Sequence, residues 1–446
     1  MKLWQKENTK KTSEKIEKFT VGRDQELDLE LAPFDVLGNM AHAIMLESIG
    51  LLEKNELQDL LTECRHIYNE VILKGDFVIN EGIEDVHSQV EYLLTQKLGD
   101  TGKKIHSGRS RNDQVLVDLK MYMRAKIREV VEATTALFEV LIQKSEQHKN
   151  ELLPGYTHLQ IAMPSSFGLW FGAYAESLVD DLGILKAAYQ VVNKNPLGSG
   201  AGYGSSFPLN RTYTTQLLGF EHPNYNVVYA QMTRGKSEYV VLSALSNIAS
   251  TLSRMAMDVC LYNSQNFSFL ILPEDLTTGS SIMPHKKNPD VAELLRAKTN
   301  RMKALPAEIA FVTSNLPSGY HRDMQLIKEI LMPSFDQMLE CLDITTFMIS
   351  NIKVKENLLD GEKYDLLFSV ENVNDLVVKG MPFRDAYRTV GNQINEGNFE
   401  PIRDLNHTLE GSIGNLCNQE ISNLFYETVN SFAFEKIDAA FENLLK

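Results

Sequence analysis

Cysteine is scarce in this sequence, with four residues among 446. Cys64, Cys260, Cys341 and Cys417 lie far apart, and no Cys-x-x-Cys pair or other spacing typical of metal ligands occurs. This pattern argues against a disulfide-rich secreted domain and against a structural metal site. We therefore expect reduced thiols in a cytoplasmic protein that has no bound metal.

Basic residues are also fewer than acidic residues. The chain has 44 lysine and arginine residues against 59 aspartate and glutamate residues, a net charge of −15. Nucleic acid and anionic membrane surfaces are therefore not expected as main partners, although a local basic pocket could still hold an acidic small molecule. The first ten residues lack the apolar core of a secretion signal, and we expect no stretch apolar enough to span a membrane.

Glycine and proline are missing from two long stretches, residues 109–153 and residues 236–272. In both stretches apolar side chains recur at spacings of three, four or seven residues, which predicts long amphipathic helices. The first helix is expected to begin near Asn112 or Asp113, whose side chains suit an N-cap. The two predicted apolar faces consist of Leu116, Leu119, Met123, Ile127, Val130, Leu137 and Leu141, and of Val240, Leu242, Leu245, Ile248, Leu252, Met255 and Val259.

Further helices are expected after Pro164, from about Pro289, and from about Met324 to beyond Ile349, with an interruption or kink at Pro333. Together with the two long helices they predict a mostly α-helical fold built around a central long-helix bundle. We expect three domains: an N-terminal helical domain at residues 1–105, the bundle at residues 106–353, and a small C-terminal helical domain at residues 354–446.

The apolar faces of these helices are wider than a two-helix seam requires. Wide faces indicate contacts on several sides, including contacts with other subunits, and they predict an obligate oligomer. A large monomeric bundle is the alternative.

Residues 279–290, which read GSSIMPHKKNPD, carry the most informative chemical pattern. Ser280 follows a flexible glycine, while Lys286 and Asn288 supply a cation and an amide two residues apart. A serine in such a loop could remove a proton from a carbon next to a carboxylate, and the other two groups could stabilise the resulting dianion. A solvated turn before a helix has the same composition.

Residues 106–113 place Arg109, Arg111 and Asn112 at the expected start of the first long helix. A helix N-terminus attracts anions, and arginine can bind a carboxylate through two parallel hydrogen bonds. The segment is therefore a candidate carboxylate-binding corner. A capped helix start with solvated arginines is the alternative.

Three other segments have polar or flexible groups. Thr157 and His158 lie in the turn at residues 155–160, and Glu293 lies about one turn into the helix that follows Pro289. Glu293 could orient His158 if the bundle brings them together, but a surface histidine and an exposed first-turn carboxylate are the plainer alternatives. In the glycine-rich residues 198–204, backbone N–H groups could face an anion or the backbone could simply pack closely.

With these motifs identified, the sequence resembles the fumarase/aspartase superfamily and, within it, the argininosuccinate lyase family. The resemblance spans nearly the whole chain, from Lys2, Leu3 and Trp4 through residues 106–114 and 154–160 to residues 279–290. It implies a mostly α-helical three-domain subunit and a homotetramer whose active sites combine segments from three subunits. It also implies a cofactor-free, reversible elimination that converts argininosuccinate to arginine and fumarate in arginine biosynthesis.

The resemblance also implies a role for each candidate residue. Ser280 would remove the Cβ proton of the succinyl group, and Lys286 and Asn288 would stabilise the aci-carboxylate that forms. His158, oriented by Glu293, would help to protonate the departing guanidino nitrogen. Substrate contacts would come from Arg111, Asn112 and Thr157 and, for the arginine part, from Tyr320, Gln325 and Lys328.

The sequence departs from the family pattern at four places. His285 stands where most members have glutamine, residues 87–91 lack a common asparagine and have Gln89 instead, and residues 232–238 lack the usual Arg-Asp pair. The spacing of residues 20–24 leaves the usual substrate-binding serine unplaced. His285 places a titratable side chain beside Lys286, and the other departures leave some of the family's substrate contacts without a counterpart.

Two other functions are compatible with this sequence. The first is another fumarate-releasing lyase of the superfamily, such as adenylosuccinate lyase, against which Tyr320, Gln325 and Lys328 argue. The second is a catalytically silent structural relative of the kind used as a lens crystallin, against which the retained Ser280 and His158 argue.

Overall fold

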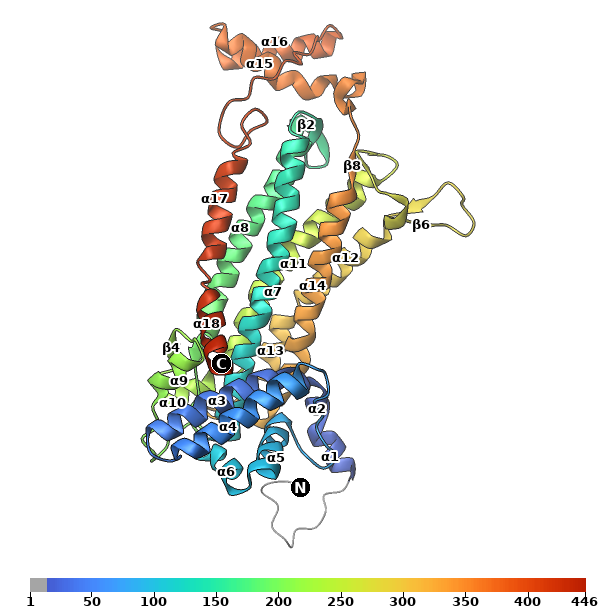
Figure 1. Ribbon diagram of the computed structural model, residues 1–446. Helices are drawn as coiled ribbons and strands as arrows, with labels where there is room; N and C mark the ends of the chain where they lie inside the picture. The colour runs from blue at the N-terminus through green and yellow to red at the C-terminus, as the bar shows by residue number, and fades with distance from the viewer. Residues whose placement is uncertain (1–13) are drawn as a thin grey trace.

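The computed structural model describes residues 14–446, so Lys2, Leu3 and Trp4 lie outside the described residues. The chain is mostly α-helical and elongated, with short helices at each end of a bundle of long helices (Figure 1). This arrangement confirms the predicted fold class.

The N-terminal helices gather at the lower end of the bundle in Figure 1. They are α1 (Glu14–Val21), α2 (Asp24–Asp28), α3 (Ala32–Ser48), α4 (Lys54–His66), α5 (Val86–Leu98) and α6 (Asp100–Lys103).

The bundle is built around two helices that run almost its full length in Figure 1, α7 (Arg111–Gln147) and α8 (Phe167–Val192). Helix α7 packs on α8 and α14, and α11 packs on α8, α12, α13 and α14. The remaining helices of this part are α9 (Arg211–Leu217), α10 (Val227–Met232), α11 (Lys236–Asn263), α12 (Asp290–Met302), α13 (Leu305–Val312) and α14 (Ile327–Asn351).

The C-terminal part first leaves the bundle and then returns to it. Helices α15 (Ser369–Val378) and α16 (Phe383–Glu396) lie beyond the upper end of the bundle in Figure 1 and have a small apolar core of their own. Helix α17 (Asn418–Asn430) then packs along α8, and α18 (Glu435–Leu445) reaches α3 and α9. The division into three domains with a boundary at residue 354 stays a prediction.

Strands occur only as short pairs in the described part of the chain. β1 (Leu152–Thr157) and β2 (Gln160–Ser166) form an antiparallel hairpin between α7 and α8. The other pairs are β3 (Lys194–Asn195) with β4 (His222–Pro223), β5 (Leu270–Ile271) with β8 (Lys353–Val354), and β6 (Thr278–Gly279) with β7 (Lys287–Asn288).

The predicted apolar faces form the bundle interior. Every residue of the predicted face of α7 is buried, and so is every residue of the predicted face of α11 except the half-buried Val240. Helical periodicity therefore predicted the core of the two longest breaker-free segments correctly.

Several helix boundaries differ from the sequence prediction. Helix α7 begins at Arg111, because the Oγ of Ser110 accepts the Asn112 N–H while the Ser110 N–H donates to Asp113. Helix α8 follows Pro164 as predicted, but Pro164 itself lies within β2, and Ser166 caps the start of the helix. Helix α14 continues through Pro333.

Helix α11 ends at Asn263 rather than running toward residue 272. The Oγ of Ser264 donates to the Leu261 carbonyl, and Ser268 adopts a left-handed φ of 53°. The chain then turns so that the Phe269 N–H donates to the Tyr262 carbonyl. Polar side chains that bond to nearby backbone compete with the helix here, although no glycine or proline is present.

Helix α11 is an exception to the expectation that no stretch is apolar enough to span a membrane. Among residues 14–446 it alone is long and apolar enough to cross a membrane by length and composition. However, 61% of its most apolar part is buried inside the molecule, where it packs against four neighbouring helices. Its apolar character is that of a bundle core helix.

Gly235 is required at the start of α11. Its φ is +83°, and a Cβ at this position would lie 2.6 Å from Cγ2 of Thr313. We expect Gly235→Ala to lower the free energy of unfolding by about 1–3 kcal/mol, because a strained backbone is added to a steric clash. Denaturant unfolding measures the effect.

Gly361→Ala is the matched control for this prediction. Gly361 has a φ of −80°, and nothing lies within 4 Å of an added Cβ. We expect it to change stability by less than about 1 kcal/mol. Equal losses in the two variants would contradict the requirement for glycine at position 235.

Candidate active site

The loop at residues 279–290 projects from the side of the molecule on a two-stranded neck (Figure 1). The neck is formed by β6 and β7 and is braced by a hydrogen bond from Thr278 to the carboxylate of Asp290. Lys287 adds an ion pair with Glu274 at 2.7 Å. Residues 281–286 of the loop are exposed, with Ile282 near the tip at 82%, whereas Ser280 at the start of the loop is half-buried.

The hydroxyl of Ser280 lies within this loop and accepts two backbone hydrogen bonds. The N–H of Met283 donates to its Oγ at 3.1 Å and the N–H of Ile282 at 3.4 Å. Two N–H dipoles directed at one oxygen stabilise negative charge on it, which is what a serine acting as a base requires. The side chains of Lys286 and Lys287 are exposed beside it, and Asn288 is half-buried.

His158 lies at the tip of the β1–β2 hairpin. Thr157 pairs with Gln160, so His158 and Leu159 form a two-residue turn, and both have left-handed φ values of 53° and 59°. Two consecutive residues other than glycine in this region are strained, and such strain is concentrated at functional sites. Thr157 and His158 are both exposed.

The hairpin that carries His158 is anchored at its base. The ring of Tyr156 packs against Phe267, with centroids 5.6 Å apart, and against Phe269. Strands β1 and β2 also contact residues 358–368. The exposed tip is thus held on a rigid support.

Arg111 and Asn112 lie at the opposite end of α7 from this hairpin. Arg111 pairs with the carboxylate of Asp85, which also caps α5 by accepting the Ser88 N–H at 2.8 Å. Burial opposes ionisation of Asp85, yet His87, Arg111 and the Ser88 N–H together hold its pKa below the ordinary value. The expected carboxylate-binding corner is therefore already occupied in part by a carboxylate of the protein.

The glycine-rich stretch at residues 198–204 does face an anion, and that anion is Asp113. The N–H groups of Gly198 and Gly200 both donate to its Oδ2 at 2.9 Å, and the N–H of Ser110 donates to Oδ1 at 2.9 Å. Burial outweighs these bonds and raises the pKa of Asp113 to about 6. Backbone packing and anion binding thus both occur in this stretch.

Two of the three residues expected to bind the arginine part, Gln325 and Lys328, are held by the N-terminal segment. The side-chain amide of Gln325 donates to the carbonyls of Thr20 and Val21 at 2.9 and 3.0 Å. The ammonium of Lys328 lies 2.5 Å from both Asp24 and Asp28. Tyr320 is 39% exposed.

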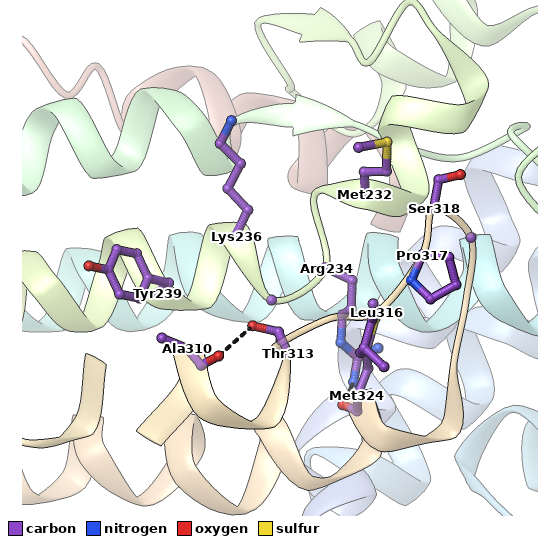
Figure 2. Close-up of a pocket in the computed structure, with 12 residues that line it drawn as sticks. Met232, Arg234, Lys236, Tyr239, Ala310, Thr313, Leu316, Pro317, Ser318 and Met324 are labelled. Carbon is purple, nitrogen blue, oxygen red and sulfur yellow. Dashed lines mark hydrogen bonds between the residues drawn. The ribbon is translucent and has the colours of Figure 1, made fainter. Parts of the chain in front are cut away.

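A cavity of about 400 Å³ adjoins this segment (Figure 2). It lies between the start of α11 and the connection from α13 to α14, and Gly319 and Met324 line it. The Arg234 guanidinium donates to the Met324 carbonyl at 2.9 Å and pairs with the buried Glu238 at 3.2 Å. The backbone that carries Gln325 is thereby fixed from the bundle side.

The candidate residues form separate groups within one chain. Helix α7 has 37 residues, which at about 1.5 Å per residue span about 55 Å. Asn112 lies in its first turn, whereas the hairpin with His158 follows its last turn (Figure 1). Among the described residues no hydrogen bond or ion pair joins His158 to Glu293, and both side chains are exposed.

One buried group in the described part of the chain has a spacing that could hold a metal ion. Ligand atoms of Asp35, His87 and Asp118 lie within 4.8 Å of one another. His87 Nδ1 already lies 2.7 Å from Asp35, and the Arg109 guanidinium interacts electrostatically with both carboxylates. Burial raises the pKa of Asp118 well above its ordinary value. These groups largely neutralise one another and need no ion for charge balance.

Comparison with known proteins places this architecture in a family. A family model described as "Lyase" matches residues 6–303. Argininosuccinate lyase from Bacteroides fragilis is 61% identical over 444 residues, covering 100% of this chain and 99% of that protein. The chain belongs to the argininosuccinate lyase family. Other members similar to it include argininosuccinate lyase from Parabacteroides distasonis, at 60% identity over 444 residues, and from Thermotoga neapolitana, at 38% identity over 87% of this chain and 97% of that protein.

Solved structures show the same fold at lower identity. EDDS lyase in complex with formate has a TM-score of 0.75 at 20% identity, covering 96% of this chain and 94% of that chain. Class II fumarase from Schistosoma mansoni has a TM-score of 0.68 at 16% identity, covering 86% of this chain and 91% of that chain. This chain therefore has the fumarase/aspartase fold, as its sequence motifs predicted.

Sequence reasoning missed several carboxylates that hold the candidate residues of this argininosuccinate lyase family member. Asp85 binds Arg111, and Asp24 and Asp28 bind Lys328. A local signal exists for Asp85, because aspartate is a favoured N-cap residue and Asp85 directly precedes α5. No local signal links Asp24 or Asp28 to Lys328, which lies about 300 residues away in the chain.

Proposed function

We propose that the protein catalyses the reversible elimination of argininosuccinate to arginine and fumarate, as a carbon–nitrogen lyase of arginine biosynthesis. The observation that carries this proposal is the 61% identity to a curated argininosuccinate lyase over the full chain. The Ser280 hydroxyl with its two backbone donors supports it from the structure. The chemistry needs a base, an acid and an anion-stabilising site, and it needs no cofactor.

The proposed reaction begins at the succinyl group. Ser280 removes a proton from Cβ, and the electron pair delocalises into the adjacent carboxylate to form an aci-carboxylate dianion. The Lys286 ammonium and the Asn288 amide stabilise this dianion. The electron pair then forms the double bond of fumarate as the Cα–N bond breaks.

The departing guanidino nitrogen takes a proton from His158, whose imidazole is oriented by Glu293. Arg111, Asn112 and Thr157 bind the succinyl carboxylates. Tyr320, Gln325 and Lys328 hold the arginine part. They lie in the segment that follows Gly319, which lines the cavity in Figure 2 together with Met324.

The active site is assembled from more than one subunit of a homotetramer. Helix α7 keeps Asn112 and His158 at opposite ends of the bundle, while Ser280 lies on a third projecting element. Apolar side chains remain exposed on the bundle helices, where they provide surfaces for subunit contacts. They are Ile184, Tyr239, Met257, Leu294 and Phe347. We place this assembly in the cytoplasm, with a three-domain subunit and neither nucleic acid nor membrane as a partner.

The substrate assignment is tested by the release of fumarate from the purified protein. We expect absorbance at fumarate wavelengths to rise with argininosuccinate and to stay unchanged with adenylosuccinate, because Tyr320, Gln325 and Lys328 suit an arginine part. Turnover of adenylosuccinate alone would replace the proposal with the second lyase. Turnover of neither would favour a catalytically silent relative.

The base is tested by removing one hydroxyl. We expect Ser280→Ala to lower kcat by about 100-fold or more, because proton abstraction is lost while the binding residues stay in place. Ser281→Ala is the matched control, since Ser281 is the exposed neighbour in the same loop and we assign it no role. A large loss of turnover in Ser281→Ala, with normal turnover in Ser280→Ala, would show that the base is Ser281 and not Ser280.

A further inference from the structure

The surroundings of Lys328 contain one more negative charge than the lysine balances. Its ammonium lies 2.5 Å from the carboxylate of Asp24 and 2.5 Å from that of Asp28. The Lys328 side chain is 4% exposed, so solvent does little to screen this cluster. Two carboxylates and one ammonium leave a net charge of −1.

A second cation that interacts electrostatically with Asp24, Arg234, does not remove this excess. Arg234 interacts electrostatically with Asp24, but its guanidinium pairs with the buried carboxylate of Glu238 at 3.2 Å. Arg234 and Glu238 together carry no net charge. Lys120 also interacts with Glu238, but burial lowers the pKa of Lys120 to about 7. Burial raises the pKa of Asp24 despite Lys328, which indicates that its carboxylate is incompletely stabilised.

The two carboxylates of the cluster differ in access. Asp28 is 2% exposed and also accepts a long hydrogen bond from the Val86 N–H at 3.4 Å. Asp24 is 21% exposed, and no donor other than Lys328 is bonded to it within residues 14–446. Asp24 is therefore the member of the pair that a ligand can reach.

The position of Asp24 is tied to the segment that carries Tyr320, Gln325 and Lys328. The side-chain amide of Gln325 binds the Thr20 and Val21 carbonyls, just before α2, whose first residue is Asp24. A cation bound by Asp24 would thus lie beside the residues assigned to the arginine part.

We propose that Asp24 is a specificity-determining residue that binds the α-ammonium group of the arginine part of the substrate. This inference rests on the proposed function and deepens it. A Lys328 ammonium already held by two carboxylates is poorly suited to be the main charge for the substrate, whereas a partly exposed carboxylate with excess negative charge suits a cation.

The chemistry of the substrate selects the α-ammonium over the guanidino group. The guanidino nitrogen carries the bond that breaks, so it must lie near Ser280 and His158. The α-ammonium is at the other end of a three-carbon arm and does not take part in the reaction. It can therefore bind to a fixed carboxylate distant from the bond that breaks.

Calorimetric titration of the full-length protein with L-arginine and with Nα-acetyl-L-arginine tests this assignment. The acetyl compound keeps the guanidinium and the carboxylate but has no α-ammonium charge. We expect arginine to bind the unmodified protein roughly 10- to 100-fold more tightly, as for a hydrogen bond between charged groups. This half of the test needs no protein variant.

The second half uses Asp24→Asn. We expect the preference for arginine over the acetyl compound to fall to within about threefold, with KM for argininosuccinate raised more than kcat is lowered. Glu26→Gln is the matched control, since it removes one charge from the same helix at a side chain that is 64% exposed and pairs only with Arg23 among the described residues. The control should keep the full preference for arginine.

The outcomes separate this inference from the proposed function. Equal binding of the two ligands by the unmodified protein, or an undiminished preference in Asp24→Asn, would overturn the role of Asp24 even if argininosuccinate is cleaved normally. Failure to cleave argininosuccinate would instead overturn the proposed function. Steric exclusion of the acetyl group would appear as a preference that Asp24→Asn retains, and it too would count against the inference.

Discussion

The length of α7 is the constraint on which the rest of this structure depends. A helix of 37 residues fixes the position of Asn112 relative to the hairpin that carries His158, and no loop movement within one chain can bring the two ends together. The breaker-free sequence that makes this helix also gives it a buried apolar face along its length. The feature that stabilises the subunit is therefore the same feature that separates the candidate catalytic groups.

The candidate residues fall into two kinds, according to their surroundings. Arg111, Gln325 and Lys328 lie at the lower end of the bundle and are already held by Asp85, by backbone carbonyls and by two aspartates. Ser280, Lys286 and His158 are instead carried on projecting elements with anchored bases. Candidate binding residues that are already held in place, and candidate catalytic groups on projecting elements, suit the proposed site that is completed when subunits associate.

The sequence predicts the long helices well because helical periodicity is a local property. It does not predict the hairpin between α7 and α8, since the His158–Leu159 turn lacks the asparagine and glycine that normally signal such turns. It also overextends α11, because serine side chains rather than a glycine or proline end that helix. These differences arise from a strained turn and from a hydrogen bond between a side chain and the backbone, neither of which can be predicted from amino-acid composition.

The candidate site is predictable only in part, because its motifs are local in the sequence but many of its contacts are not. Motif resemblance predicts Ser280, His158 and Lys286 as candidates, but the carboxylates of Asp24 and Asp28 meet Lys328 only through the tertiary fold. The anion bound by the glycine-rich loop is likewise a side chain from a distant segment, Asp113. Contacts between residues far apart in sequence carry no local signal, and they decide which charges are free to bind a substrate.

A crystal structure of the assembled Ser280→Ala protein with argininosuccinate bound is the most direct test of the account. The account predicts that the loop at residues 279–290 and His158 contact the same succinyl group and come from different chains. A bound substrate whose contacts with Asn112, His158 and Lys286 all come from a single chain would contradict it.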